Sequence, residues 1–187
     1  MKILDIKVYK LFSRSILLKI ITDEGIEGIG QFISFNLNSQ LSYLSSTILP
    51  LIKGKDPTNI SSLWELMYWR GFGRNGWIQV IGAIDIALHD ILGKKLNLPL
   101  WKYFGSSQSK SIKLYWSMGH GSKKTINKMI KDVSKGLNLG FKGYKIRMDW
   151  HEYCQDVDPN KDIEMAKQVK QLLSKSSMFA FDANAGY

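Results

Sequence analysis

Four polar side chains stand at the ends of two short apolar runs in the last quarter of the sequence. Lys145 and Arg147 belong to the run GYKIRMDW, and Asp182 and Asn184 belong to the run MFAFDANAGY. Each run is typical of a buried strand, and residues two apart on a strand point to the same side. Two cations and a carboxylate brought together at strand ends suggest a site for metal-assisted proton abstraction.

Strands and helices that alternate along the second half of the chain must position these side chains. Apolar patterning predicts strands at Ile112–Ser117, Gly143–Met148 and Met178–Ala183. Helical spacing predicts helices at Lys123–Asn138 and Asn160–Ser174 between them. Strands that alternate with helices of this length favour right-handed βαβ units and a parallel sheet.

The first part of the chain has a different organisation, in which strands come first and helices follow. The turn Asp23-Glu24-Gly25 predicts a hairpin, and Asp56-Pro57-Thr58 predicts the start of a helix. Ser106–Ser111 is polar and is the best candidate for a linker, so we predict domains at 1–110 and 111–187. The predicted strands are Lys2–Phe12, Ile16–Thr22 and Ile26–Ile29, and the predicted helices include Asn38–Ile52, Ile78–Gly93 and a short turn from Pro99.

Composition and charge limit the classes of function. The chain has 187 residues, of which 44% are hydrophobic, and this is enough for a substantial core. The net charge of +10 raises the question of nucleic-acid binding, but the lysines are scattered and are not interleaved with aromatic residues. The densest basic stretch, Lys123–Lys135, has helical spacing and favours a solvated helix face. A small anionic substrate suits the same charge, and we expect no nucleic-acid partner.

The cysteine content and the N-terminus bear on location. Cys154 is the single cysteine, which excludes an internal disulfide. The N-terminus has no apolar core of signal-peptide length, and no run approaches about 18 apolar residues. We therefore expect a cytoplasmic protein with no membrane partner.

Taken in order, these features resemble the enolase superfamily, and within it the mandelate racemase/muconate lactonizing enzyme branch with its sugar-acid dehydratases. The residues that carry the resemblance are the helix GAIDIALHDILGKKLNLPLWKYFG, the pair Lys145-x-Arg147 and the pair Asp182-x-Asn184. The resemblance covers essentially the whole chain. It implies an α+β capping domain followed by the first β/α units of a TIM-type (β/α) barrel, with the barrel incomplete.

The resemblance also implies a chemistry. Members of this family abstract the proton next to a carboxylate, and a bound Mg²⁺ stabilises the resulting enediolate. By resemblance, Asp182 is the first of three carboxylate ligands to that Mg²⁺, and Asn184 lies beside it near the substrate. Lys145 faces the substrate carboxylate from the neighbouring strand end.

Arg147 departs from a pattern that has lysine at both positions. Arginine stays protonated in nearly all settings, so Arg147 suits an electrostatic or bidentate carboxylate partner better than a proton acceptor. A racemase needs a base on each face of the carbon, whereas a dehydratase can work with a base on one face. The sequence thus favours a sugar-acid (aldonate or aldarate) dehydratase, and a racemase, epimerase or cycloisomerase stays open.

Capping domains of this family set specificity through loops that close over the barrel mouth. In this sequence the corresponding candidates are Gln31–Asn36 and Arg70–Trp77. Arg74 and Trp77 are predicted to bind a polyhydroxy acid by charge and by stacking. Packing explains Trp77 equally well.

Structural roles compete with functional ones at each of these positions. Asp182 suits a loop-capping aspartate with Asn184 as a turn residue, and Lys145 and Arg147 suit rim charges. A further set of residues has the chemistry of a site but suits structural or solvent-exposed roles better. These residues are His89 and Asp90 on a capping-domain helix, His120 in a loop, and the metal-like group Asp149, His151 and Cys154, which lacks a second matching pair.

Three predicted barrel strands cannot close a barrel, which takes about 200 residues. The resemblance implies that two more metal ligands and a His–Asp base come from later strands. We therefore expect a fragment, one half of a split gene or a decayed product, inactive alone. Its expected partner is a further copy in a homo-oligomer or a second chain that completes the barrel, and a non-catalytic assembly module is the alternative.

Overall fold

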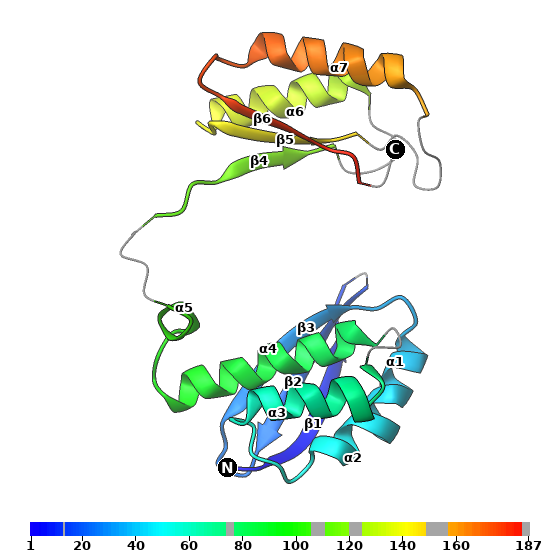
Figure 1. Ribbon diagram of the computed structural model, residues 1–187, viewed down its shortest axis with the longest axis vertical. Helices are drawn as coiled ribbons and strands as arrows, with labels where there is room; N and C mark the ends of the chain where they lie inside the picture. The colour runs from blue at the N-terminus through cyan, green and yellow to red at the C-terminus, as the bar shows by residue number, and fades with distance from the viewer. Residues whose placement is uncertain (13, 74–76, 106–110, 120–124, 149–156, 185–187) are drawn as a thin grey trace. The chain divides into compact units, whose positions relative to one another are not determined.

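In the computed structural model the chain divides into two compact units, Met1–Gln108 and Ser109–Tyr187 (Figure 1). The structure describes residues 1–187 except 13, 74–76, 106–110, 120–124, 149–156 and 185–187. The predicted linker lies almost entirely outside the described residues, and the predicted domain limits stay a prediction. No helix in the described ranges is both long enough and apolar enough to cross a membrane.

The first unit is built from three strands followed by helices. Its elements are β1 (Ile3–Lys10), β2 (Ser15–Thr22), β3 (Glu27–Ile33), α1 (Leu37–Tyr43), the π-helical η1 (Leu44–Ile48), α2 (Leu49–Ile52), α3 (Ile60–Glu65), the π-helical η2 (Leu66–Arg70), α4 (Ile78–Lys95) and α5 (Leu100–Tyr103).

The three strands form an antiparallel meander in the order β1-β2-β3. The central strand alternates as the pattern predicts, with Ile16, Leu18 and Ile20 almost fully buried. The predicted turn is confirmed, and Gly25 has a positive φ of 77° that favours glycine. This alternation turns one face of the sheet toward a core shared with the helices.

The last strand of the meander is longer than the predicted Ile26–Ile29, because its ladder to β2 continues to Ile33. The prediction ended at Ile29 because the next residue is Gly30, and glycine is rare in strands. Gly28 and Gly30 both face α4, which lies across the sheet in Figure 1. A Cβ atom at Gly28 or Gly30 would collide with the carbonyl oxygen of Ala87 or Ala83, respectively. The strand therefore uses glycine so that the helix backbone can approach it.

The helix predicted at Asn38–Ile52 is present as α1, η1 and α2 in succession. It begins where the Asn36 side chain accepts a hydrogen bond from the Ser39 backbone N–H at 3.2 Å. Before α3, the Asp56 carboxylate accepts bonds from the Thr58 backbone N–H at 2.9 Å and the Thr58 hydroxyl at 2.8 Å. A side-chain hydrogen bond thus caps α1, and the turn that Asp56 stabilises comes just before α3.

The second unit is a three-stranded parallel sheet in the order β4-β5-β6 with two helices on one face (Figure 1). Its core is formed by Met129 and Val133 of the first helix and by Met165 and Val169 of the second, packed against Tyr144 and other residues of the sheet. The elements are β4 (Tyr115–Met118), α6 (Ile126–Asn138), β5 (Gly143–Arg147), α7 (Pro159–Leu172) and β6 (Met178–Asp182).

The prediction that the first of these strands begins at Ile112 is wrong. Pairing with β5 begins at Tyr115, opposite Gly143, and Ile112 and Leu114 are 86% and 71% exposed. Apolar residue types alone gave the earlier start, but a strand also needs a hydrogen-bonding neighbour. The other predicted elements of the second unit agree with the structure to within two residues, except that the predicted helix start at Lys123 lies outside the described residues.

Candidate active site

Strand register places the predicted site residues together at the carboxyl ends of β5 and β6. Arg147 is paired with Asp182, and Lys145 with Ala180. Tyr144 and Ile146, which alternate with the two cations, are buried under α6 and α7. Lys145 and Arg147 therefore lie on the opposite face of the sheet, which the helices do not cover.

The central contact of this site joins Lys145 and Asp182. The ammonium Nζ of Lys145 lies 2.7 Å from Oδ2 of Asp182, and the side chains are 29% and 38% exposed. The other oxygen, Oδ1, accepts a hydrogen bond of 3.1 Å from the Asn184 backbone N–H. Asn184 has a φ of 46°, a left-handed conformation that asparagine tolerates better than most residues. The loop-capping role considered for Asp182 is thus present alongside the ion pair.

Each member of the pair shifts the pKa of the other. The hydrogen bond to Asp182 raises the pKa of Lys145, although partial burial and the charge of Arg147 oppose this shift. The hydrogen bond from Lys145 lowers the pKa of Asp182, and the Asn184 N–H and the charge of Arg147 act in the same direction. Lys145 is therefore a protonated cation at neutral pH while Asp182 is its partner.

Two backbone features at the strand ends were missed by sequence reasoning. The Met148 N–H donates to the Asp182 carbonyl oxygen at 2.9 Å, so the ladder continues beyond β5 and fixes the backbone of Asp182. Gly119 follows β4 with a φ of 88°, and a Cβ atom there would lie 2.7 Å from the Arg147 carbonyl oxygen. The signal for Gly119 was a glycine two residues after a predicted strand, where close backbone approach is common.

The remaining predicted binding residues belong to the first unit. The Trp77 ring stacks on Tyr43 with centroids 4.6 Å apart and an interplanar angle of 13°. Burial raises the pKa of Tyr43 to about 12. Trp77 thus takes part in packing, and its predicted contact with substrate stays a prediction. Arg74 lies outside the described residues.

The other candidate residues from the sequence either make structural contacts or lie outside the described residues. The Asp90 carboxylate accepts a bond from the Ile29 backbone N–H at 2.9 Å and from Lys94 at 2.8 Å, and so ties α4 to β3. Nδ1 of His89 lies 2.9 Å from the Asp85 carbonyl oxygen of its own helix. Both contacts are structural. His120, Asp149, His151 and Cys154 lie outside the described residues.

Similarity to known proteins decides the family. Residues 12–105 match the family model of the mandelate racemase/muconate lactonizing enzyme N-terminal domain. This match spans half of the 187 residues. The chain belongs to this family.

The curated relatives that this chain matches include members of the D-galactonate dehydratase family. A D-galactonate dehydratase family member of Marinomonas sp. strain MWYL1 is 32% identical over 133 residues, which are 70% of this chain and 32% of the relative. The D-galactonate dehydratase family member RspA of Cellvibrio japonicus is 32% identical over 152 residues, which are 79% of this chain and 37% of the relative. This chain thus spans about a third of the length of the curated relatives it matches.

Solved structures of mandelate racemase/muconate lactonizing enzyme relatives share the fold. One from Paracoccus denitrificans PD1222, complexed with magnesium, superposes with a TM-score of 0.82 and 25% identity, over 100% of this chain and 52% of that one. An enolase superfamily member from Polaromonas sp. JS666 superposes with a TM-score of 0.81 and 25% identity, over 100% of this chain and 53% of that one. The predicted fold class is confirmed: an N-terminal capping domain is followed by a partial parallel sheet of an incomplete barrel.

The chemistry of Asp182 fits one ligand of a Mg²⁺ site. Mg²⁺ prefers oxygen donors and is commonly bound through one or two carboxylates. Asp182 offers a partly exposed carboxylate at a strand end, which already holds the cation of Lys145. In the described part of the chain, no three His, Cys, Asp or Glu side chains are close enough to hold an ion. Asp182 thus has the chemistry of one such ligand.

Proposed function

We propose that this chain is the N-terminal part of a Mg²⁺-dependent enolase-superfamily enzyme that abstracts the proton α to a carboxylate. The observation that carries the proposal is the meeting of Lys145, Arg147 and Asp182 at the carboxyl ends of adjacent parallel strands. In barrels of this kind the active site lies at that end. The family membership of the chain supports the same reaction class.

We further propose that the reaction is dehydration of a sugar acid, an aldonate or aldarate. The similarity to D-galactonate dehydratase family members supports this substrate class. Dehydration removes the proton from C2 and the hydroxyl group from C3, which leave together as water. The enol that forms becomes a 2-keto-3-deoxy acid.

Lys145 and Arg147 provide two positive charges for the substrate carboxylate. Arg147 stays protonated and can bind a carboxylate or hydroxyl group with its planar fork. Lys145 is held protonated by Asp182. When Asp182 is engaged by another cation, the largest cause of the raised Lys145 pKa disappears, and Lys145 then gives up its proton more readily than in the ion pair.

Asp182 is the proposed Mg²⁺ ligand of this chain. When bound, Mg²⁺ supplies positive charge that stabilises the carboxylate of the substrate as its α-proton leaves. Asn184 helps to orient Asp182 through its backbone N–H. We propose that the other ligands come from later barrel strands outside these 187 residues, for example from a second chain that completes the barrel.

A chimera tests this function. Residues 1–187 are fused to the barrel segment of the C. japonicus relative that follows the matched region, and aldonates and aldarates are screened with Mg²⁺. We expect a 2-keto-3-deoxy acid as product. Lys145→Met and Asp182→Asn should each lower kcat/KM by about 10²–10⁴-fold.

Two results would contradict the proposal. Full activity of the Lys145→Met chimera would remove Lys145 from the chemistry. Exchange of the α-proton with solvent deuterium into both enantiomers, without loss of water, would identify a racemase instead of a dehydratase.

A further inference from the structure

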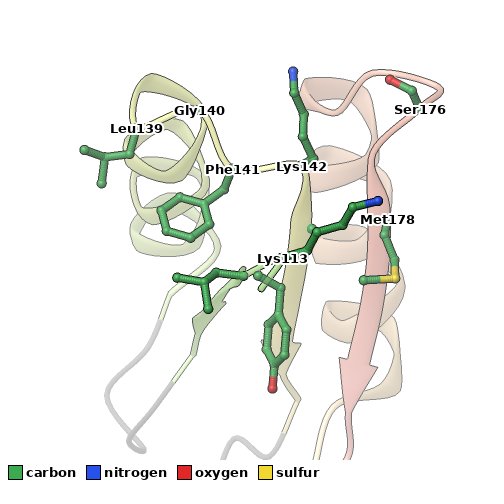
Figure 2. A pocket seen from close by; sticks show the side chains of 10 residues that line it. Lys113, Leu139, Gly140, Phe141, Lys142, Ser176 and Met178 are labelled. Carbon is green, nitrogen blue, oxygen red and sulfur yellow. The ribbon is translucent and has the colours of Figure 1, made fainter. Parts of the chain in front are cut away.

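The cavity shown in Figure 2 is open because the barrel is incomplete. Its volume is about 630 Å³, and Tyr115, Gly143 and Met178 are among the residues that line it. Strand pairing places these three residues on the sheet face that also carries Lys145 and Asp182. In a closed barrel this face is the interior, which further strands enclose. The first unit, in contrast, has a core that its own strands and helices form.

In the first unit, α1 buries polar side chains where α4 buries apolar ones. Gln40 and Tyr43 are the buried residues of α1, with 5% and 7% of their surfaces exposed. The buried residues of α4 form a long apolar row that includes Ile81, Ile84 and Leu88. Burial of apolar surface is the main favourable contribution to packing. Packing therefore stabilises α1 less than it stabilises α4.

Both buried side chains of α1 contain a polar atom that has no hydrogen-bond partner among the described residues. These atoms are Oε1 of Gln40 and Oη of Tyr43. The amide Nε2 of Gln40 reaches Oε1 of Gln79 only at 3.5 Å. A buried polar atom without a partner costs free energy, which is regained when the atom meets water. The packed position of α1 thus carries a penalty that opening would remove.

The surroundings of α1 suit such an opening. A cavity of about 560 Å³ has Ser39, Ser42 and Trp77 among its lining residues. The ring of Trp77, the residue before α4, stacks on Tyr43. At its end α1 continues into η1, a π-helical turn, and such turns interrupt the regular hydrogen-bond ladder of a helix. The ends of α1 therefore differ from those of a helix fixed in a continuous core.

We propose that α1 is a strap that opens locally from α4, with η1 as its hinge and the Tyr43–Trp77 stack as its latch. Asn36 caps α1, so the segment Gln31–Asn36 moves with the strap. The opening couples this segment to Trp77, and both are places where the sequence predicts substrate contacts. That role in substrate entry rests on the proposed function, whereas the opening itself does not.

Native-state amide hydrogen exchange of the intact 187-residue chain tests the opening alone. The amides of Gln40 and Tyr43 in α1 are compared with the amide of Ile84 in α4, each corrected for its intrinsic rate. We expect the α1 amides to exchange about 10²-fold faster, because α1 opens while α4 stays folded.

Variants test the cause of the opening. Tyr43→Phe and Gln40→Met remove the unpartnered atoms and nearly keep the side-chain volume, so each should slow exchange of the α1 amides about ten-fold. Trp77→Leu removes the latch and should speed this exchange about five-fold. Tyr144→Phe is the matched control, because the Tyr144 hydroxyl donates to the Phe141 carbonyl oxygen at 2.7 Å. It should speed exchange in β5 and leave α1 unchanged.

Four outcomes would overturn the proposal. Equal exchange in α1 and α4 would mean that α1 opens only with the whole unit. Faster exchange in Tyr43→Phe and Gln40→Met would mean that the two polar atoms have partners in solution, such as bound water. Unchanged exchange in these two variants would mean that α1 frays without exposing Gln40 and Tyr43. Unchanged exchange in Trp77→Leu would exclude the stack as the latch.

Discussion

The Lys145 ammonium lies 2.7 Å from the Asp182 carboxylate, across two adjacent parallel strands. This ion pair gives the carboxylate a cation from within the chain itself. Any other cation that binds Asp182 has to compete with Lys145 for Oδ2. The pair therefore couples the charge state of the lysine to the occupancy of the carboxylate.

Replacing Asp182 should change the protonation of Lys145. In Asp182→Asn the hydrogen bond that raises the Lys145 pKa is lost, while partial burial and Arg147 still lower it. We expect the pKa of Lys145 to fall, measured by NMR titration of the lysine Cε and Nζ signals. Asp132→Asn, on α6, removes the same charge away from the site and serves as the control. An unchanged Lys145 pKa in Asp182→Asn would falsify the coupling.

The stability of the second unit should depend on pH through the same pair. The pKa of Asp182 is lowered in the folded state, so its contribution is present above the ordinary value of 3.8 and is lost as pH falls through the folded-state pKa. The pKa of Lys145 is raised, so its contribution is present below 10.5 and is lost as pH rises through the folded-state pKa. Urea unfolding of the wild type and Lys145→Gln checks this at several pH values. The difference in unfolding free energy should be largest near neutral pH and should vanish in acid, and a difference that persists in acid would contradict it.

Glycine at position 30 should be essential to the first unit. The Cβ atom of Gly30→Ala would collide with the Ala83 carbonyl oxygen, and neither backbone can move freely. We expect a loss of about 3 kcal/mol or more in unfolding free energy, measured by denaturant titration. Gly82→Ala is the matched control, because nothing lies within 4 Å of its Cβ position in α4. It should stabilise the unit by about 0.5–1 kcal/mol, and similar destabilisation by both variants would argue against this packing.

The two units should respond separately to core mutations. Met129 is fully buried in the core of the second unit, and the first unit has a core of its own. We expect Met129→Ala to cost about 2–5 kcal/mol in the second unit. Amide hydrogen exchange should show lower protection in β5 and α6 and unchanged protection in β2. Equal loss of protection in both units would show that they unfold as one.

The sequence predicted the position of side chains where residue chemistry and strand periodicity indicate the same residues. The polar residues at the ends of β5 and β6 were predictable, because alternation places Lys145 and Arg147 on one side and parallel strands end at the same edge. The direct bond from Lys145 to Asp182 was not predictable from the sequence, because it depends on how the two strands are staggered and on how far the lysine side chain extends. Nor did the sequence show that Asn184 takes a positive φ.

Two errors in the elements have a common cause. The pattern extended the first barrel strand back to Ile112 and ended the third strand of the meander at Ile29, before Gly30. In both places the outcome depends on a neighbour: the pairing of β4 with β5 begins only at Tyr115, and the close approach of α4 requires glycine at position 30. Residue types describe a segment, whereas strand limits depend on what lies beside it.

The register of Arg147 against Asp182 also restricts how this region can change during evolution. Insertion or deletion of one residue between Gly143 and Lys145 would exchange the two faces of β5, because side chains alternate along a strand. Ile146 would then stand beside the carboxylate, and a cation would enter the apolar layer under the helices. Related sequences should therefore keep the length of this strand constant, while variation in length collects in the connections between the strands and helices.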